Sequence, residues 1–535
     1  MYFNANRLIS VFDQFEGIII YGAGNYAHMI YPLLVQWGMK EKIISFTQTK
    51  KSGADSIDGI PVVSVDKVYC NKIKCVVLIA VSELYLDEIK RTLSEYDYPN
   101  VVSLVDYSIT YKESDKIFNQ MQTYEEYCRH IAGWYTQTHM DYETYSSILN
   151  KLVERGRQRE KDWNLIVVIC GHLSSRILKI VSALKTEKMD IVMLRYAKGV
   201  NPWCEESLEK MGIQVKKCEG IEELLYEALQ YAPLVYYVDP QWSDCSWVRI
   251  MLKNKEFIGK IVLALYDVMN DGHLQIGEEK LRTERYALEN ADGIVWRWFS
   301  KELLEEKGFE FKGKSIQFID YCNPVGKCVL SNHRNMSEIK LCMGQGYADE
   351  YVDDREHDAK YFDHARIGEI LAKIGNRQDC ILHLYAGNLS ERNIRRCEDY
   401  QKEYRNFRFF LGTKYDDLLI RMREYDFGCE LWTGGEEPPD DVMVGEYSGS
   451  NYRNCVRNFF FDFIEAGLPV VTTASSRLWE YLSAYDIVVK MTLDNLDIDY
   501  LKQHKEYYRE QVMAARKELG IDKHISRLID FFNEV

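Results

Sequence analysis

The sequence predicts an α/β protein made of several parallel, doubly wound sheets. Short apolar runs rich in β-branched residues, such as GIIIY, VVIC and VVTT, recur along the chain and are separated by stretches with helical spacing. This alternation of strands and helices is typical of parallel sheets. The chain has 535 residues, 46% of them hydrophobic, which is enough for roughly three to five domains, each with its own core.

The first predicted domain covers residues 1–110. Its expected strands are GIIIY, KIISFT, GIPVVS, CVVLIAVS and NVVSLV, with helices between them. Residues 111–160 contain no strand runs but show helical spacing in YEEYCRHIAGWYTQ and YETYSSILNKLVERGRQREK. We therefore expect one small Rossmann-like sheet followed by a helical connector.

Two larger blocks follow, at residues 161–333 and 334–535. The first contains NLIVVICG, DIVMLRY, IQVKKC, LVYYVD, KIVLALYD, GIVWRW and SIQFIDY as strand runs. The second contains DCILHLYAG, FRFFLG, FGCELW, VVTT and DIVVK, and it ends in two helices. The alternation predicts two Rossmann-like lobes of similar size with C-terminal helices.

Bulk properties exclude several classes of function. A formal net charge of -15 and a pI near 5.4 argue against nucleic acid as a partner, although a local basic pocket for one nucleotide is compatible with them. The chain has no run of 18 apolar residues, and its N-terminus carries scattered charges unlike a signal peptide. The 14 cysteines are dispersed, and none forms a CxxC pair. We expect a cytoplasmic protein with reduced thiols and no transmembrane segment.

The run FFFDFIEAGLPVVTT, residues 459–473, places two carboxylates in an apolar segment. It predicts a helix that ends at Gly467, a turn at Pro469 and a buried strand. In α/β proteins the N-terminus of such a helix lies beside the carboxyl ends of the strands, where ligands bind. Asp462 and Glu465 are therefore candidate ligand-binding residues, or helix residues with only a local role.

Together with the two similar lobes, this segment resembles the donor-binding segment of retaining glycosyltransferases of the GT-B fold, and the resemblance covers about two-thirds of the chain. It implies that Asp462 holds the ribose of a nucleotide sugar, that Glu480 corresponds to a second helix acid, and that Glu465 is solvated. The chain departs from the pattern in two places. Asp462 replaces the usual glutamate, and Phe459 stands where a basic residue is common.

The donor phosphates need positive charge from elsewhere. Arg453 and Arg457 lie one turn apart and suit phosphate oxygens, although a solvated helix start explains them equally well. The segment YAGNLSERN predicts a strand running into a small-residue turn at a helix start. There the backbone N–H groups of Gly387 and Asn388, with Arg392, are candidates for the diphosphate.

On the acceptor side, His172 follows the first strand of the first lobe, where many GT-B enzymes have Gly-His. The resemblance to inverting enzymes implies that His172 is a general base oriented by a strand-end aspartate, either Asp239 or Asp267. The alternative is a loop histidine with a structural hydrogen bond. This signature and the helix acid at Asp462 favour opposite stereochemical outcomes, so retention and inversion both stay open.

The cluster YDVMNDGH, residues 266–273, invites a metal-site interpretation, but an acceptor-binding loop or a capped turn fits better. GT-B enzymes neutralise the leaving diphosphate with helix dipoles and basic groups. We therefore expect no metal and no cofactor.

In the first domain, Gly22, Gly24 and Asn25 follow a strand and open a helix, which is the context of a dinucleotide-binding turn. About 20 residues further on, Thr47 and Gln48 stand where an acid would bind the ribose of NAD. The domain resembles the sugar-nucleotide-binding domain of bacterial sugar acyltransferases. We expect it either to bind a nucleotide sugar or to act as a docking module.

The combined hypothesis is a bacterial glycosyltransferase that moves a sugar from a nucleotide-diphosphate donor to a polysaccharide precursor, a lipid-linked acceptor or a protein. Two alternatives stay open: a CDP-polyol phosphate transferase of the teichoic-acid type, and a non-catalytic scaffold of a polysaccharide-biosynthesis complex. The sequence gives neither the sugar nor the acceptor, and it leaves a homo-oligomer open.

Overall fold

The computed structural model describes the chain apart from residues 1, 4, 37, 50–54, 82–84, 110–126, 129, 133, 136–149, 155–160, 172, 197–201, 219, 241–244, 254, 266–267, 272–277, 324–336, 346–360, 362, 387–390, 414, 441, 445–446 and 457. It divides into two compact units. Unit 1 comprises Met1–Arg159 and Cys218–Gln230, and unit 2 comprises Glu160–Lys217 and Tyr231–Val535.

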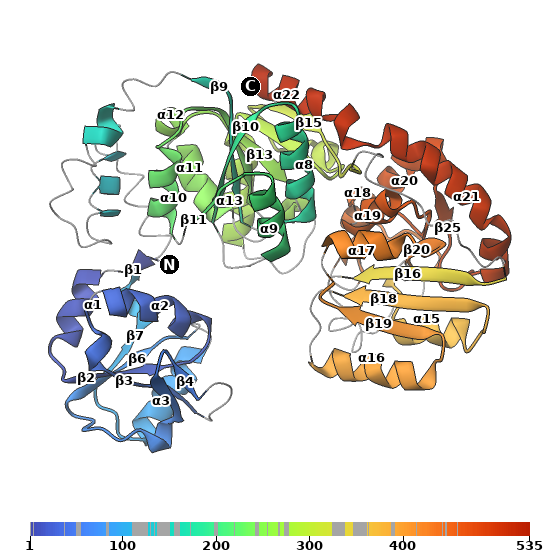
Figure 1. The fold of residues 1–535 in the computed structure, drawn as a ribbon. Helices are drawn as coiled ribbons and strands as arrows, with labels where there is room; N and C mark the ends of the chain where they lie inside the picture. Colours follow the sequence, from blue (N-terminus) through green and yellow to red (C-terminus); the bar gives the residue numbers. More distant parts are fainter. Residues whose placement is uncertain are drawn as a thin grey trace. The chain divides into compact units, whose positions relative to one another are not determined.

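Unit 1 contains a six-stranded sheet in the order β4-β5-β3-β2-β6-β7 (Figure 1). Its strands are parallel except for β4, so the parallel strands follow the order 3-2-1-4-5 of a doubly wound sheet. The elements are β1 (Tyr2–Phe3), α1 (Ala5–Phe12), β2 (Gly17–Tyr21), α2 (Asn25–Gln36), β3 (Ile43–Gln48), β4 (Ser56–Ile57), β5 (Ile60–Ser64), β6 (Cys75–Ile79), α3 (Leu86–Glu95), β7 (Val101–Ser103), α4 (Leu104–Tyr107), β8 (Ser108–Ile109) and α10 (Ile221–Ala228).

The central strands of this sheet, β2 and β6, are buried along their whole length, as their apolar sequences GIIIY and CVVLI require. One apolar cluster, with Leu8, Ile30 and Phe46, covers one face. A second, with Ile89 and Leu93 of α3, covers the other. The predicted small Rossmann-like sheet is therefore confirmed.

The predicted helical connector falls mostly outside the described residues. Its described parts, residues 127–128, 130–132, 134–135 and 150–154, are helical. The rings of Trp134 and Tyr135 pack against Tyr226 of α10, with ring centroids 6.4 and 4.8 Å apart. This contact joins α10 to unit 1.

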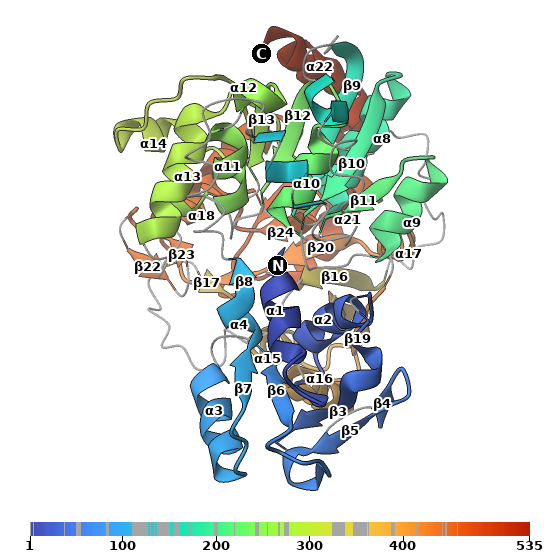
Figure 2. The ribbon, with the colours of Figure 1, turned by 90° about the vertical axis from the view of Figure 1, so that its left-hand side faces the viewer.

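The first lobe of unit 2 is a fully parallel seven-stranded sheet in the order β11-β10-β9-β12-β13-β14-β15. Figure 2 shows α11 and α13 on one side of this sheet and α8 on the other. The elements are β9 (Asp162–Cys170), α8 (Ser175–Thr186), β10 (Asp190–Arg195), α9 (Pro202–Lys210), β11 (Val215–Lys217), β12 (Pro233–Asp239), α11 (Ser246–Lys253), α12 (Lys255–Ile258), β13 (Ile261–Leu265), α13 (Glu278–Asn290), β14 (Gly293–Trp296), α14 (Lys301–Glu306) and β15 (Lys314–Gln317).

The second lobe holds a parallel six-stranded sheet in the order β19-β18-β16-β20-β24-β25, which is 3-2-1-4-5-6 in chain order. The elements are β16 (Ile339–Gln345), β17 (Asp363–His364), α15 (Ile367–Ile374), β18 (Cys380–Ala386), α16 (Glu391–Glu403), β19 (Phe407–Leu411), α17 (Tyr415–Met422), β20 (Phe427–Glu430), β21 (Trp432–Thr433), β22 (Met443–Val444), β23 (Tyr447–Ser448), α18 (Gly449–Asn454), α19 (Asn458–Ala466), β24 (Val470–Thr472), α20 (Ser476–Leu482), β25 (Val488–Lys490), α21 (Ile498–Glu518) and α22 (Ile525–Glu534). The predicted α/β class with two Rossmann-like lobes is confirmed, but the sequence interpretation missed β16, the central strand of this sheet.

The chain passes between the two lobes twice, and the two passages are hydrogen-bonded to each other. Cys322 N–H donates to the Leu519 carbonyl at 2.9 Å, and Ile521 N–H donates to the Cys322 carbonyl at 2.8 Å. After the second passage α22 packs on the first lobe, where Phe532 lies 5.5 Å from Tyr237 between ring centroids (Figure 1). The last helix therefore belongs to the first lobe, although its sequence follows the second.

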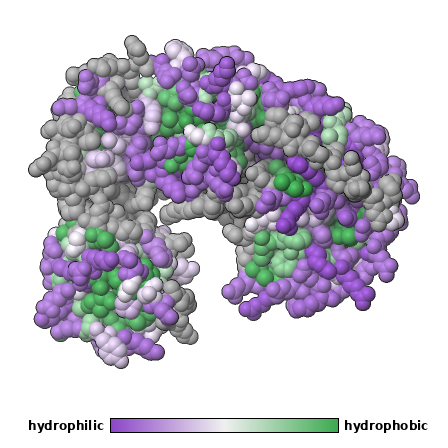
Figure 3. Space-filling model, viewed as in Figure 1, coloured by the Kyte–Doolittle hydropathy of each residue, from purple (hydrophilic) through white to green (hydrophobic). Residues whose placement is uncertain are grey.

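The described residues of unit 2 on the face shown in Figure 3 are mostly hydrophilic. Figure 3 shows hydrophilic residues along α16, as its sequence ERNIRRCEDYQKE predicts. Among the helices of the described residues, none is both long and apolar enough to cross a bilayer.

Candidate functional site

The helix–turn–strand unit predicted from residues 459–473 is present in the second lobe. Helix α19 ends at Ala466, and Gly467 adopts a φ of +81°, a left-handed conformation that favours glycine. The turn is closed by hydrogen bonds from Gly467 N–H to Ile464 O and from Leu468 N–H to Phe463 O, both 2.9 Å. The chain then enters β24, which is buried throughout.

Two glycines let α19 lie directly on the sheet. A Cβ at Gly344 of β16 would lie 2.3 Å from the ring of Phe459, and one at Gly428 of β20 would lie 2.2 Å from the ring of Phe463. Phe459, which stands where the resemblance expects a basic residue, is therefore a packing residue. Because Gly344 lies near the carboxyl end of β16, the N-terminus of α19 is placed at the carboxyl edge of this sheet, next to the switch point between strands β16 and β20.

The two carboxylates of α19 face the first lobe. Lys179 Nζ of α8 lies 3.0 Å from Asp462 Oδ1 and 2.7 Å from Glu465 Oε2. Glu465 also accepts hydrogen bonds from Asn323, at 3.2 Å from the backbone N–H and 2.6 Å from the side-chain amide. The expectation that Glu465 is solvated is wrong, since the residue is only 2% exposed and its charge is balanced by Lys179.

A second ion pair lies beside the first. Arg297 binds Asp320 through Nε and Nη2, with Nη2 2.9 Å from Oδ2, and Arg176 Nε lies 2.9 Å from Asp320 Oδ1. Burial alone would raise the pKa of Asp320, but Arg297 and Arg176 outweigh it and hold this pKa below its usual range. Three cations thus meet three carboxylates at the junction of the lobes. We call this group the interlobe charge cluster: Arg176, Lys179, Arg297, Asp320, Asp462 and Glu465.

The interlobe charge cluster borders a small cavity. Side chains of α8, of the segment after β15, and Asp462 line it, together with Ile521. Its free volume is about 10 Å³, which is room for about one water molecule. A ribose therefore does not fit beside Asp462 while Lys179 holds its position.

The sequence interpretation missed four of the six cluster residues: Arg176, Lys179, Arg297 and Asp320. A signal was available, because each of the last three is a single charge inside an apolar run: ILKIV, VWRWF and QFIDY. The same pattern marks Asp462 and Glu465 in FFFDFIEA. A charge in such a run is buried with its segment and needs a partner of opposite sign.

The other predicted donor residues are only partly described. Arg453 is bound by two carboxylates, with Nε 3.2 Å from Glu437 and Nη1 3.1 Å from Asp440. Glu480 is exposed on α20 and pairs at 3.6 Å with Arg477 of the same helix. Gly387, Asn388 and Arg457 lie outside the described residues, and Arg392 lies in the first turn of α16, with its side chain outside the description.

On the acceptor side, Asp239 ends β12 and is 2% exposed. Its carbonyl accepts a hydrogen bond from Gly171 N–H at 3.0 Å, so the ends of β9 and β12 lie side by side at the switch point of the first sheet. His172 and Asp267 lie outside the described residues. The predicted acceptor loop is bound by Glu284 of α13. Its carboxylate accepts hydrogen bonds from Met269 N–H and from the backbone and side chain of Asn270.

The glycine turn of unit 1 also lies at a switch point. Gly22 has a φ of +123°, and a Cβ there would lie 2.6 Å from the Ala80 carbonyl oxygen. Around Gly24 there is open space, since nothing lies within 4 Å of an added Cβ. Helix α2 begins at Asn25, whose side chain is outside the description, and the Thr47 hydroxyl donates to Val63 O at 3.1 Å.

Comparisons with known proteins give a likeness of fold at low identity. No protein-family model and no curated protein sequence matches the chain. It is similar to sucrose-phosphate synthase from Thermosynechococcus elongatus, with 12% identity and a TM-score of 0.46 over 69% of this chain and 98% of that one. It is also similar to HepE of Anabaena in complex with UDP and glucose, with 10% identity and a TM-score of 0.45 over 68% of this chain and 98% of that one. A third similar structure is the lipopolysaccharide outer core galactosyltransferase WaaB, with 11% identity and a TM-score of 0.37 over 69% of this chain and 96% of that one. Similarity at this level assigns no activity to the chain.

Proposed function

We propose that the chain is a glycosyltransferase that uses a nucleotide-diphosphate sugar as its donor. The observation that carries the proposal is the position of α19. Its N-terminus lies at the carboxyl edge of a sheet ordered 3-2-1-4-5-6, beside the switch point where such sheets bind nucleotides. The first lobe presents a second carboxyl edge, with Asp239 at its own switch point.

For the donor, we propose a site at the carboxyl edge of the second lobe rather than beside Asp462. The carboxylate of Asp462 is bound by Lys179, and the Asp462 side chain is only 9% exposed, so binding a ribose there requires Lys179 to move away. The segment after β18, with Gly387 and Asn388, leads into the N-terminus of α16 and remains our candidate for the diphosphate.

For the acceptor, we propose a surface-polysaccharide precursor, a lipid-linked glycan or a protein, bound by the first lobe. Asp239 and His172 are candidates for the general base pair because the ends of β9 and β12 are adjacent. The proposed arrangement is that of a GT-B enzyme, in which the acceptor and donor bind to different lobes.

The test is a turnover screen with UDP-, GDP- and dTDP-sugars, read as donor hydrolysis and as transfer to a mixture of glycan acceptors. Turnover of at least one donor is expected, and the anomer of the product separates retention from inversion. CDP-glycerol and CDP-ribitol belong in the same screen. Turnover of these alone would replace the proposal with a polyol-phosphate transferase, and no turnover with any donor would overturn it.

A further inference from the structure

The connection between β5 and β6 in unit 1 turns alternate side chains to solvent. Residues 65–74 contain one short 3₁₀ turn and no α-helix, although a helix is usual at this place in a doubly wound sheet. Val65 is buried, and Val68 and Cys70 pack against the same apolar cluster. Between and beyond them, Tyr69 is 94% exposed and Ile73 is 76% exposed. We call residues 65–74 the β5–β6 loop.

This exposure is not a consequence of a loose loop. Asn100 binds the loop by donating a hydrogen bond to the Ile73 carbonyl at 2.9 Å, and Lys74 N–H donates to the Asn71 carbonyl at 2.9 Å. The inward side chains of Val65 and Val68 fix which residues point outward. Hydrogen bonds and apolar contacts therefore fix the loop in a conformation that exposes two large apolar side chains to solvent.

The same loop carries lysines next to these two side chains in the sequence. Within the part of the chain that the structure describes, neither Lys67 nor Lys72 forms an ion pair with a carboxylate. The ammonium group of Lys72 lies 4.8 Å from the ring centroid of Tyr98 and donates to the Tyr96 carbonyl. The third lysine of the loop, Lys74, pairs with Glu16 at 2.6 Å, so Lys67 and Lys72 are the two that can meet an anionic partner.

We propose that the β5–β6 loop docks unit 1 on the surface of a bilayer rich in anionic lipids. Tyr69 and Ile73 enter the interfacial layer, and Lys67 and Lys72 contact lipid phosphates. Tyrosine suits this layer because its ring is apolar and its hydroxyl stays hydrated. Unpaired lysines beside apolar side chains add electrostatic attraction to anionic headgroups.

A bilayer fits this surface better than a protein partner does. A stable protein interface buries about 800 Å² on each side with complementary shapes, whereas two protruding side chains flanked by lysines form a much smaller contact. A lipid interface accepts single side chains without a matching pocket. The proposal is independent of the proposed transferase activity, because it concerns only unit 1 and needs no donor.

The experiment is sedimentation of the full chain with vesicles of phosphatidylcholine alone and with about one-third phosphatidylglycerol, without nucleotide sugar. We expect binding to the anionic vesicles that weakens as salt increases. The Tyr69→Ser, Ile73→Ser double variant and the Lys67→Gln, Lys72→Gln double variant should each lower the partition coefficient at least tenfold. Tyr69, Ile73 and Lys67 are exposed and Lys72 is half-buried, so the unfolding transition of each variant is measured alongside, and the tenfold loss should appear at temperatures where the variant is folded.

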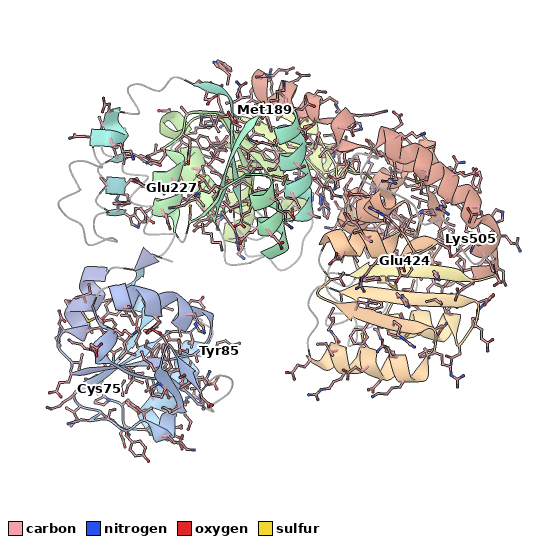
Figure 4. The ribbon with its side chains drawn as sticks, in the orientation of Figure 1. Cys75, Tyr85, Met189, Glu227, Glu424 and Lys505 are labelled. Atoms are coloured by element: carbon pink, nitrogen blue, oxygen red, sulfur yellow. The ribbon has the colours of Figure 1, made fainter. Side chains whose placement is uncertain are left out.

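Tyr85→Ser is the matched control, because Tyr85 is 56% exposed in the same unit but comes after the carboxyl end of β6. The β5–β6 loop meets the other end of that strand, at Cys75 (Figure 4). It should bind vesicles like the wild type. Equal binding of the loop variants and the wild type would overturn the proposal, as would no binding of the wild type to anionic vesicles. Self-association that is lost in the Tyr69→Ser, Ile73→Ser variant, without vesicle binding, would also overturn it and would indicate a second copy of the chain as the partner.

Discussion

Lys179 Nζ lies 3.0 Å from Asp462 Oδ1, and the two side chains come from different lobes and are only 5% and 9% exposed. One ammonium group therefore joins α8 of the first lobe to α19 of the second. Glu465 is held by the same ammonium group at 2.7 Å. In this arrangement Asp462 could bind a ligand only if its ion pair with Lys179 of the other lobe broke.

Replacing Lys179 by methionine should destabilise unit 2 by about 3–5 kcal/mol, because two buried carboxylates lose their cation. Chemical denaturation followed by tryptophan fluorescence measures this change. Lys210→Met is the control, since Lys210 is 71% exposed in a surface pair with Glu206 and should change stability by less than about 0.5 kcal/mol. If the two variants unfold at the same denaturant concentration, the buried pair does not hold the junction.

Asp462→Asn should lower stability by about 1–3 kcal/mol, because the amide binds Lys179 more weakly than the carboxylate does. Affinity for the preferred nucleotide should stay within about twofold, since the proposed donor site lies at the carboxyl edge of the second lobe and not beside Asp462. Calorimetric titration together with denaturation measures both quantities. The role inferred from the GT-B resemblance gives the opposite pattern, an affinity lowered by roughly 1.5–3 kcal/mol at unchanged stability.

Glu465→Gln should also be destabilising, by about 1–3 kcal/mol, because Glu465 accepts bonds from both Lys179 and Asn323. The resemblance described in the sequence analysis implies a solvated Glu465, for which this variant would be nearly silent. Exposed Glu480→Gln is the comparison and should leave the unfolding transition in place. An unfolding curve for Glu465→Gln that overlays the wild type would restore the original expectation.

Gly428→Ala should destabilise the second lobe by about 1–3 kcal/mol, because the new methyl group meets the ring of Phe463 at 2.2 Å. Gly435→Ala is the control, since nothing lies within 4 Å of a Cβ at that position. The smaller side chain in Phe463→Leu should recover part of the loss when combined with Gly428→Ala. Additive effects of the two substitutions would contradict direct packing.

His383 should make stability depend on pH between about 4 and 6.5. Burial, helped by Arg408 and Lys340, lowers the pKa of His383 to about 4, and Nδ1 lies 2.5 Å from the Tyr425 hydroxyl. Since an unfolded histidine has a pKa of about 6.5, the unfolded chain binds the proton first as pH falls. The wild type should therefore lose about 1–2 kcal/mol relative to His383→Gln between pH 7.5 and 4.5, after allowing for partial solvent screening. A constant difference between the two proteins over this range would rule out the effect.

The fold was predictable because the strands of parallel sheets are buried on both faces and form continuous apolar runs. GIIIY, LVYYVD and VVT all became strands where the sequence predicted them. Strand β16 was missed because its sequence, IKLCMGQ, is short in β-branched residues and includes the glycine that α19 packs against. Its position at the centre of the sheet depends on pairing with β18 and β20, which no local pattern reveals.

The candidate site was harder to predict because its partners come from distant parts of the chain. Lys179 and Asp462 are 283 residues apart in sequence. The pattern around Asp462 indicated a charge in an apolar helix but not which group would balance it. The turn at Gly467, in contrast, depends only on neighbouring residues and was predicted correctly.

The most direct test of the proposed function is calorimetric titration of the full chain with UDP, GDP and dTDP. We expect saturable binding of at least one of them at one site in unit 2, with the same affinity in Asp462→Asn. Saturable binding should also raise the unfolding temperature, since ligand at 100 times its Kd adds about 2.7 kcal/mol of stability. No binding of any of the three would contradict the proposed function and would favour a non-catalytic scaffold.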